Sequence, residues 1–199
     1  DMAMYQAKGA GRNTLRFFDP RTQANVTART LLEAGLREAL RDGQFLLHYQ
    51  AQIREHDGIV GAEALVRWQH PQRGLISPAE FIPVAEASGL IVPLGAWILR
   101  TACLQLVEWA QNPVTARWTL AVNVSARQFR HSQFVDEVLG VLGETGANPH
   151  RLKLELTETL LLDDVEDTIQ RMATLRAVGI GFALDDFGTG YSSLSYLKR

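Results

Sequence analysis

Four oxygen-bearing side chains could meet around one metal ion, because each comes late in a segment with the alternating pattern of a β-strand. They are Glu63, Asn123, Glu155 and Asp185. Carboxylates brought together repel each other and raise each other's pKa, and a divalent cation removes that penalty. A set of carboxylate and amide oxygens, without histidine or cysteine, suits Mg²⁺, Mn²⁺ or Ca²⁺ better than zinc. The pattern therefore predicts a site for a hard divalent cation.

A second ion and a phosphate group would fit beside these residues. Asp186 follows Asp185 directly and could bridge two ions, the arrangement used for in-line displacement at phosphorus. Arg67 lies on the same predicted strand face as Glu63 and could hold a phosphate with two hydrogen bonds. Each residue alone has a plainer interpretation: a solvated carboxylate, a turn residue at Asn123, a turn cap at Asp186, or a surface ion-pair partner at Arg67. Four residues in phase on successive strands favour the metal site.

The predicted elements alternate between strands and helices after an opening hairpin. Hydrophobic patterns predict strands over 44–53, 59–68, 118–125, 151–158 and 180–188, and helices over 1–8, 30–43, 79–89, 93–111, 132–146 and 163–179. Such alternation implies parallel strands with right-handed crossovers, in an open sheet or a barrel. An open sheet between two helix layers is apolar on both faces, whereas a barrel can gather polar groups at its mouth. We therefore expect an α/β fold of the TIM-like barrel type.

Two of the predicted helices begin with recognisable capping chemistry. Thr30 and Glu33 have the spacing of a capping box at the start of the helix before the hairpin. Ser77, followed by Pro78 and Glu80, repeats this start at the helix after the hairpin. These positions set the expected beginnings of the two helices.

Composition excludes several classes of protein. The 199 residues are 46% hydrophobic and 21% charged, with a formal net charge of −2, so DNA, RNA and an anionic membrane surface are not expected partners. The single cysteine, Cys103, excludes an internal disulfide, and the histidines lack zinc-ligand spacing. We find no Walker sequence, no signal peptide and no apolar run of ~20 residues. We expect a cytoplasmic domain without a membrane segment in this stretch, although an anchor could lie outside it.

Several longer motifs follow one another in a fixed order. They are EALVRW at 63–68, FIPVAE at 81–86, NVS at 123–125, ELTE at 155–158 and DDFGTGYSSL at 185–194. Over residues 30–199 this ordered set resembles the EAL domain, a bacterial cyclic di-GMP phosphodiesterase. The opening DMAMYQAKGAGRN resembles the last helix of a GGDEF, or diguanylate cyclase, domain. We therefore expect residues 1–28 to be the end of a GGDEF domain with a linker, and residues 29–199 to be the N-terminal portion of an EAL domain.

The resemblance implies a fold, a reaction and a set of site residues. The fold would be a TIM-like barrel with an antiparallel first strand, of which this stretch holds about five of the eight strands. The reaction would be hydrolysis of cyclic di-GMP to linear pGpG at a site for two metal ions, dependent on Mg²⁺ or Mn²⁺ and inhibited by Ca²⁺. The implied metal ligands are Glu63, Asn123, Glu155, Asp185 and Asp186, the implied substrate contacts are Gln50, Leu65 and Arg67, and the implied loop anchor is Glu158. The family's catalytic lysine would lie beyond Arg199.

The resemblance also implies partners and leaves two other functions open. It implies a homodimer formed through the EAL domain and a GGDEF domain in the same polypeptide. The alternatives are a receptor that binds cyclic di-GMP without hydrolysing it and a regulatory or dimerisation module. Because about three strands and the lysine would lie outside residues 1–199, we expect this length alone to have little or no hydrolytic activity. We also expect an unpaired edge on the strand near 180–186.

Overall fold

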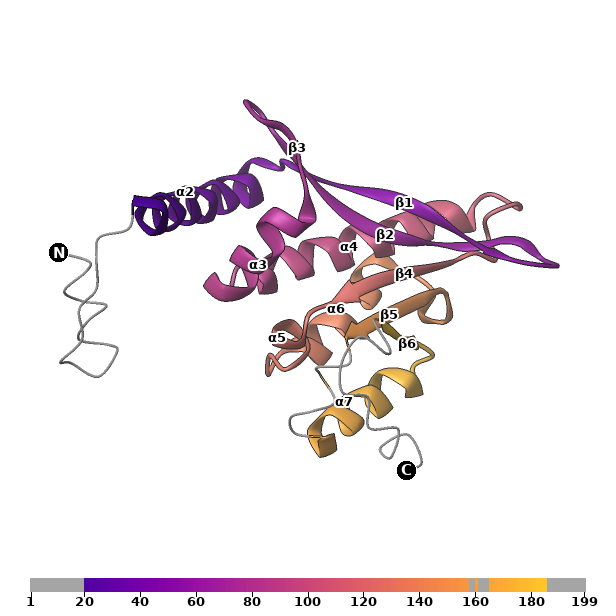
Figure 1. Cartoon of the computed structure of the whole chain (residues 1–199). Helices are drawn as coiled ribbons and strands as arrows, with labels where there is room; N and C mark the ends of the chain where they lie inside the picture. The colour runs from indigo at the N-terminus through magenta and orange to yellow at the C-terminus, as the bar shows by residue number, and fades with distance from the viewer. Residues whose placement is uncertain (1–19, 158–159, 161–164, 186–199) are drawn as a thin grey trace.

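The computed structural model describes residues 20–157, 160 and 165–185 (Figure 1). The helices are α2 (Pro20–Asp42), α3 (Pro78–Ser88), α4 (Ile91–Ala110), α5 (Ala126–Phe129), α6 (Phe134–Thr145) and α7 (Val165–Ala177), with a short 3-10 helix η1 (Pro149–Arg151). The strands are β1 (Phe45–Arg54), β2 (Gly58–His70), β3 (Gly74–Ile76), β4 (Thr119–Val124), β5 (Leu152–Thr157) and β6 (Gly181–Asp185). The pattern of hydrophobic residues thus predicted every long strand, but it missed β3 and α5.

A single mixed sheet organises the described residues. Its strand order is β1-β2-β4-β5-β6, and β3 pairs with β2. The β1–β2 pair is antiparallel, and the pairs β2–β4, β4–β5 and β5–β6 are parallel. This confirms the predicted α/β layout of a barrel with an antiparallel first strand. Within the described residues, β1 and β6 form the two edges of the sheet.

The core lies between one face of the sheet and the helices. In β5 the buried positions alternate with partly exposed ones, as a strand with one buried face requires. The buried side chains are Leu152, Leu154 and Leu156, and those on the opposite face are Lys153, Glu155 and Thr157. α4 packs on α6, and α6 on α7, along the sheet. Burying each leucine stabilises the fold by about 1.5–3 kcal/mol, and this leaves the opposite face available for polar residues.

Helix α2 begins at Pro20 and not at Thr30, so the start predicted for this helix is wrong (Figure 1). The Thr30 hydroxyl donates to the Val26 carbonyl oxygen at 3.0 Å, a bond typical of a helix interior. Residues 20–29 contain no glycine and no proline after Pro20, and proline suits the first helical position. The helix therefore continues across the boundary expected between residues 28 and 29.

Neither of the two predicted capping patterns forms its side-chain hydrogen bonds. Glu33 pairs with Arg37 along the surface of α2, and Glu80 pairs with Arg73. Ser77 does precede α3 in an extended conformation, but its side chain makes no capping hydrogen bond. An arginine within reach of each carboxylate offers a charge-assisted bond in place of the backbone N–H.

Helix α4 is long and apolar enough to cross a membrane by length and composition, which the sequence analysis did not expect. The structure explains its apolarity by burial in the core. Its buried residues are Ile91, Leu94, Gly95, Ile98, Leu99, Ala102, Cys103 and Leu106. On its exposed side, Arg100 forms an ion pair with Glu144 of α6.

Candidate functional site

The registers of the first strands place the predicted site residues on one face of the sheet. Gln50 lies opposite Glu63 in the β1–β2 pair. Glu63 is level with Ala121 of β4, two residues before Asn123. Asn123 in turn lies opposite Glu155 of β5. Because side chains alternate along a strand, all of these residues share the face that points away from the helix-packed core.

Glu63 and Asn123 are in direct contact across β2 and β4. The Asn123 side-chain amide donates to Glu63 Oε1 at 2.6 Å. This bond orients the amide so that Asn123 Oδ1 points away from Glu63. A carboxylate and a carboxamide thus lie side by side near the carboxyl ends of their strands.

Glu155 is shielded from solvent and paired with a lysine of its own strand. Its side chain is 11% exposed, and Oε1 lies 3.3 Å from Lys153 Nζ. Lys153 precedes it by two residues and therefore shares its face. The ammonium group offsets the cost of keeping this carboxylate charged in a shielded place.

The remaining predicted ligands lie at or beyond the limit of the described residues. The backbone of Asp185 ends β6, opposite Thr157, and its side chain is not described. Asp186 and Glu158 lie outside the described residues. Within the residues that the structure covers, no three histidine, cysteine, aspartate or glutamate side chains gather in a metal-ligand cluster.

The described donors fit a hard divalent cation in their chemistry. Glu63 and Glu155 supply carboxylates and Asn123 supplies an amide oxygen, the ligand types that Mg²⁺ and Mn²⁺ take. Magnesium keeps several water ligands and needs only one or two carboxylates from the protein.

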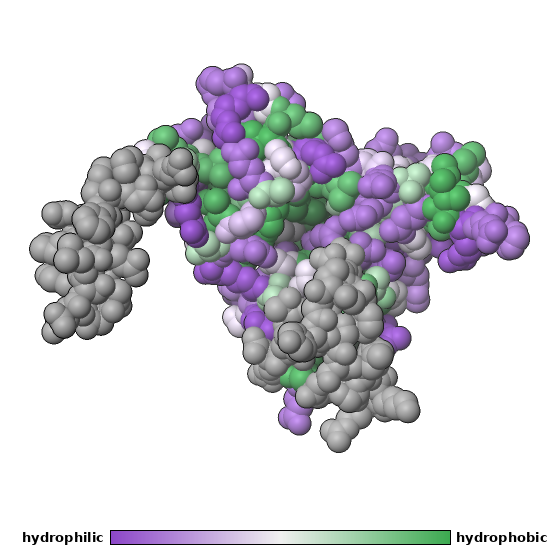
Figure 2. Space-filling view, in the orientation of Figure 1, coloured by the Kyte–Doolittle hydropathy of each residue, from purple (hydrophilic) through white to green (hydrophobic). Residues whose placement is uncertain are grey.

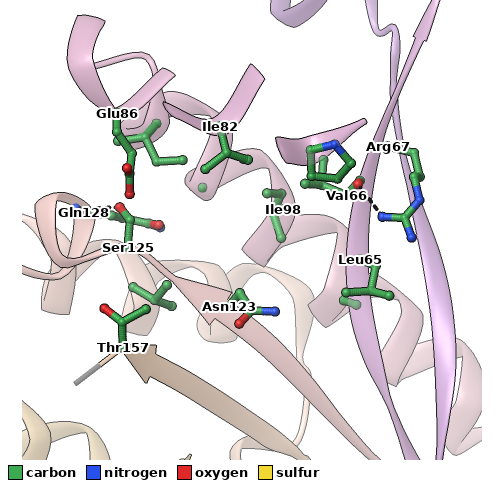
Figure 3. Close-up of a pocket in the computed structure, with 15 residues that line it drawn as sticks. Leu65, Val66, Arg67, Ile82, Glu86, Ile98, Asn123, Ser125, Gln128 and Thr157 are labelled. Carbon is green, nitrogen blue, oxygen red and sulfur yellow. Dashed lines mark hydrogen bonds between the residues drawn. The ribbon is translucent and has the colours of Figure 1, made fainter. Parts of the chain in front are cut away.

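A pocket of about 270 Å³ lies beside Asn123, between the sheet and the helices α3, α4 and α5 (Figure 3). Figure 2 shows it as a hollow with apolar walls in the middle of this face. Figure 3 shows Arg67 and Leu65 at the β2 end of the pocket and Glu86, Ser125 and Gln128 at the opposite end. The structure therefore brings two of the predicted substrate contacts, Leu65 and Arg67, to the same pocket as Asn123.

The guanidinium group of Arg67 makes one hydrogen bond among the described residues. Its Nη1 donates to the carbonyl oxygen of Val66, its chain neighbour, at 2.8 Å. No ion pair of Arg67 is found among the described residues, so the surface ion-pair interpretation gains no support there. Gln50 lies exposed on the outer strand of the hairpin, opposite Glu63 and outside the pocket lining.

Sequence reasoning missed four polar residues of the pocket: Glu86, Ser125, Gln128 and Thr157. Glu86 and Ser125 belong to motifs that the family resemblance used, FIPVAE and NVS, without a role for these side chains. Gln128 lies in α5, where the Ser125 hydroxyl accepts from its backbone N–H at 3.2 Å and caps the helix. A serine followed three residues later by glutamine is a capping-box spacing that could have indicated this short helix.

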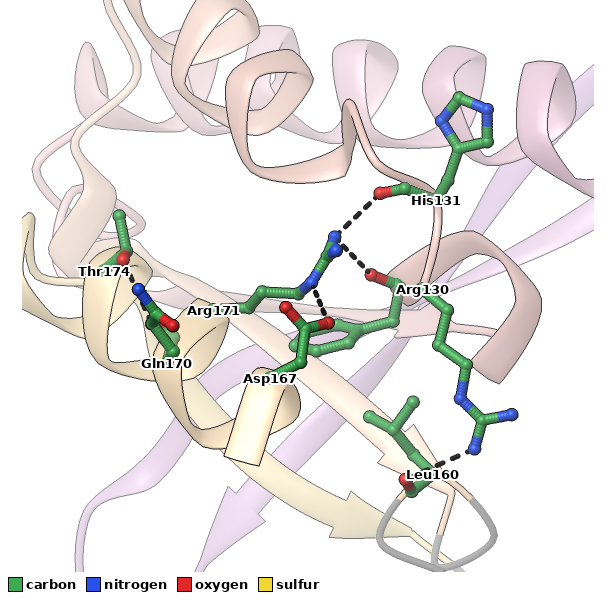
Figure 4. A network of polar contacts seen from close by, with 8 residues as sticks. Arg130, His131, Leu160, Asp167, Gln170, Arg171 and Thr174 are labelled. Atoms are coloured by element: carbon green, nitrogen blue, oxygen red, sulfur yellow. Dashed lines mark hydrogen bonds and ion pairs between the residues drawn. The ribbon is translucent and has the colours of Figure 1, made fainter. Parts of the chain in front are cut away.

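Arg171 of α7 ties the end of α5 to the rest of the domain (Figure 4). It pairs with Asp167 at 2.6 Å and donates to the carbonyl oxygens of His131 at 2.8 Å and Phe129 at 3.4 Å. Arg130 reaches the carbonyl oxygen of Leu160 at 3.4 Å. Because these bonds hold backbone atoms just after Gln128, they limit movement of the helix that carries it.

A family model and several known proteins match this chain. The family model described as "EAL domain" matches residues 33–199. The chain is 46% identical over 200 residues to the bifunctional diguanylate cyclase/cyclic di-GMP phosphodiesterase MucR of Pseudomonas aeruginosa, covering 100% of this chain and 29% of MucR. It is 41% identical over 199 residues to the cyclic di-GMP phosphodiesterase PdeR of Escherichia coli, covering 100% of this chain and 30% of PdeR. The chain thus spans less than a third of the length of these relatives.

Solved structures show the same fold. The PaMucR phosphodiesterase in its c-di-GMP complex matches with a TM-score of 0.80 and 46% identity, covering 85% of this chain and 68% of that one. The EAL enzyme Bd1971, in a form bound to cAMP and cyclic di-GMP, matches with a TM-score of 0.79 and 31% identity, covering 87% and 48%. These likenesses cover most of this chain and agree with the α/β barrel layout described above.

Proposed function

Because this chain belongs to the EAL domain family, we propose that its protein hydrolyses cyclic di-GMP to linear pGpG in a reaction that depends on Mg²⁺ or Mn²⁺. The observation that carries the proposal is the contact between Glu63 and Asn123 beside the pocket that Arg67 lines. It brings a carboxylate, a carboxamide and a cationic phosphate partner together at the carboxyl ends of parallel strands. The relatives named as phosphodiesterases, MucR and PdeR, support the same reaction.

The roles we propose follow from the chemistry of each side chain. Glu63, Asn123 and Glu155 would hold a divalent cation, with Asp185 and Asp186 completing a site for two ions. When bound, such ions polarise a phosphate oxygen and lower the pKa of water. Arg67 would hold the phosphate through its paired N–H groups, and Leu65 and Gln50 would contact other parts of the substrate. Glu158 would anchor the loop that begins at Asp185.

The reaction itself opens one phosphodiester of the ring. A water oxygen bonds to phosphorus, the bond from phosphorus to the ribose 3′ oxygen breaks, and that oxygen takes up a proton. The product is linear and keeps its phosphate at the 5′ end. Arg67 contributes by neutralising charge on the phosphate oxygens that do not react.

Hydrolysis of cyclic di-GMP by the whole protein tests this proposal. With Mg²⁺ or Mn²⁺ present, we expect linear pGpG from the wild type and a loss of about a hundredfold or more in kcat for Glu63→Gln, which removes the charge but can still accept from Asn123. Glu55→Gln is the matched control, because Glu55 is an exposed glutamate in the turn between β1 and β2. Binding of cyclic di-GMP without product from the wild type would instead identify a receptor.

We further propose that the whole protein acts as a homodimer through this domain and carries a GGDEF domain in the same polypeptide. The likeness to MucR, a bifunctional relative, supports the second part of this proposal. Light scattering of the whole protein, with and without cyclic di-GMP, tests the first part. A monomer under both conditions would contradict it.

A further inference from the structure

We propose that Gln128 recognises the base of the nucleotide in the pocket, through hydrogen bonds from its side-chain carboxamide to the polar edge of a guanine ring. The inference rests on the proposed function, because it names the part of cyclic di-GMP that this pocket would hold. It makes Gln128 a residue that determines specificity and takes no part in bond breaking.

The first observation is that the Gln128 carboxamide is buried without a partner. Gln128 is 4% exposed and lines the pocket. Its backbone N–H is bound to Ser125, but within the described part of the chain its side chain makes no hydrogen bond. A buried carboxamide with unmade hydrogen bonds is costly, and a ligand in the pocket would remove that cost.

The second observation is that the structure makes room for this carboxamide on helix α4. A Cβ atom at Gly95 would lie 2.2 Å from Gln128 Nε2 and 2.3 Å from its Oε1. The carboxamide therefore lies directly over the Gly95 backbone, where any other residue would displace it. On the other side, Phe129 is fully buried and Arg171 holds its carbonyl oxygen, so α5 presents Gln128 from a fixed position.

The shape and chemistry of the pocket suit one flat heterocycle. Its volume of about 270 Å³ is just below the ~300–1,000 Å³ that enclose a whole ligand, so it has room for a base but not for a cyclic dinucleotide. Most of its lining is apolar, including Ile82, Ile91 and Ile98. Apolar walls suit the two faces of a base, and buried polar groups suit its edge.

The polar groups match a guanine edge. Guanine offers two N–H donor groups beside one another and a carbonyl acceptor, and a carboxamide can both accept and donate. Glu86, at the same end of the pocket (Figure 3), adds an acceptor for a second N–H. Arg67 lies at the opposite end, where the phosphate attached to the same nucleoside would be held.

Substitution of Gln128 by leucine tests the proposal, because leucine keeps much of the volume and removes the carboxamide. Calorimetry in EDTA, where metal-dependent turnover is blocked, should show cyclic di-GMP binding weakened by about tenfold, the worth of one or two hydrogen bonds. With Mn²⁺, KM for cyclic di-GMP should rise similarly. Hydrolysis of bis(p-nitrophenyl) phosphate, a diester without a base, should stay within about twofold of the wild type.

Two further measurements separate recognition from a structural role. The melting temperature of Gln128→Leu should be unchanged or higher, because the substitution removes an unpaired buried polar group. Gly95→Ala should weaken cyclic di-GMP binding as well, since the new methyl group displaces the carboxamide while leaving residue 128 intact. Gln170→Leu, an exposed glutamine on α7, is the control and should change none of these quantities.

The possible results distinguish a failure of the Gln128 inference from a failure of the proposed function. Unchanged cyclic di-GMP binding in Gln128→Leu overturns the inference and leaves the proposed phosphodiesterase untouched. Equal losses toward cyclic di-GMP and the base-free diester would show that Gln128 only supports the fold, which also overturns it. If the wild type neither binds nor hydrolyses cyclic di-GMP, the proposed function fails, and the inference fails with it.

Discussion

The ion pair between Lys153 and Glu155 keeps a cationic group beside one of the proposed metal ligands. Glu155 is 11% exposed and Lys153 is 34% exposed, at 3.3 Å. The positive charge of the Lys153 ammonium group stabilises the Glu155 carboxylate, as a bound divalent cation would also do.

Replacing Lys153 by methionine should show how much this ion pair contributes to the stability of the fold. The variant removes the ammonium group beside a shielded carboxylate, so we expect the free energy of unfolding to fall by about 1–3 kcal/mol. Denaturant unfolding in EDTA measures the loss, and added Mg²⁺ should recover part of it if Glu155 is a metal ligand. The double variant Lys153→Met/Glu155→Gln should lose less than Lys153→Met alone, and an equal or larger loss would argue against the ion pair as the cause.

Arg67 carries a second prediction at the scale of one residue. Replacing it by alanine should raise KM for cyclic di-GMP by about ten- to a hundredfold, the worth of a charge-assisted contact with phosphate. Lysine should restore only part of the loss, because its single ammonium group cannot form the paired bonds of a guanidinium.

Steady-state kinetics of the whole protein check the Arg67 prediction. Arg54→Ala is the matched control, since Arg54 is exposed on the hairpin and pairs with Asp57. A KM for Arg67→Ala equal to that of the control would remove Arg67 from the proposed substrate contacts.

At the scale of elements, α4 shows how burial controls chemical reactivity. Burial raises the pKa of the Cys103 thiol to about 11, against a small opposing effect of a hydrogen bond with Thr145. The side chain is fully buried in the core. The thiol is therefore protonated at neutral pH, and the single cysteine of this chain behaves as a core residue.

The raised pKa of Cys103 predicts a loss of stability in alkali. The folded state holds the thiol proton more tightly than the unfolded state, whose pKa is near 9.0. This contribution is complete below about pH 9 and lost as pH rises through about 11, at most about 2–3 kcal/mol. Denaturant unfolding from pH 8 to 11 should show a steeper decline for the wild type than for Cys103→Val.

Tyr49 does not affect the difference in pH dependence between the wild type and Cys103→Val. Burial also raises the pKa of the Tyr49 hydroxyl, with help from Glu108, so it acts in the same direction in both proteins. Parallel pH profiles for the wild type and Cys103→Val would therefore contradict the role of the thiol. As a second check, native Cys103 should resist iodoacetamide at pH 8 and react after unfolding.

At the scale of the whole molecule, the sheet of the described residues has two edges, β1 and β6. An exposed strand edge offers unpaired backbone groups to any other strand. A polypeptide limited to residues 1–199 should therefore self-associate, and light scattering should give a mass above 22.1 kDa. We also expect little or no hydrolysis of cyclic di-GMP by this polypeptide.

The experiment needs a polypeptide whose end at Arg199 is confirmed by mass spectrometry. A monomer that unfolds in one cooperative step would show that the edges are protected in some other way. Rapid hydrolysis by the same sample would show that the residues needed for turnover all lie within residues 1–199.

Much of this architecture followed from the sequence, because strand and helix patterns are local. The alternating leucines in 152–156 place Glu155 on the polar face, because this alternation is a local property of the strand. The order of elements then restricts the topology to parallel crossovers, and the ordered motifs point to one family. The start of α2 was missed, because Thr30 satisfies a capping pattern in the sequence and yet lies inside a helix with no breaker before it.

What only the tertiary structure decided is which polar groups meet. The bond from Asn123 to Glu63 joins residues sixty positions apart and depends on the register of β2 against β4. The burial of Gln128 over Gly95 likewise depends on packing between α5 and α4. Side-chain contacts of this kind are set by distances across the fold, and no local pattern of residues encodes them.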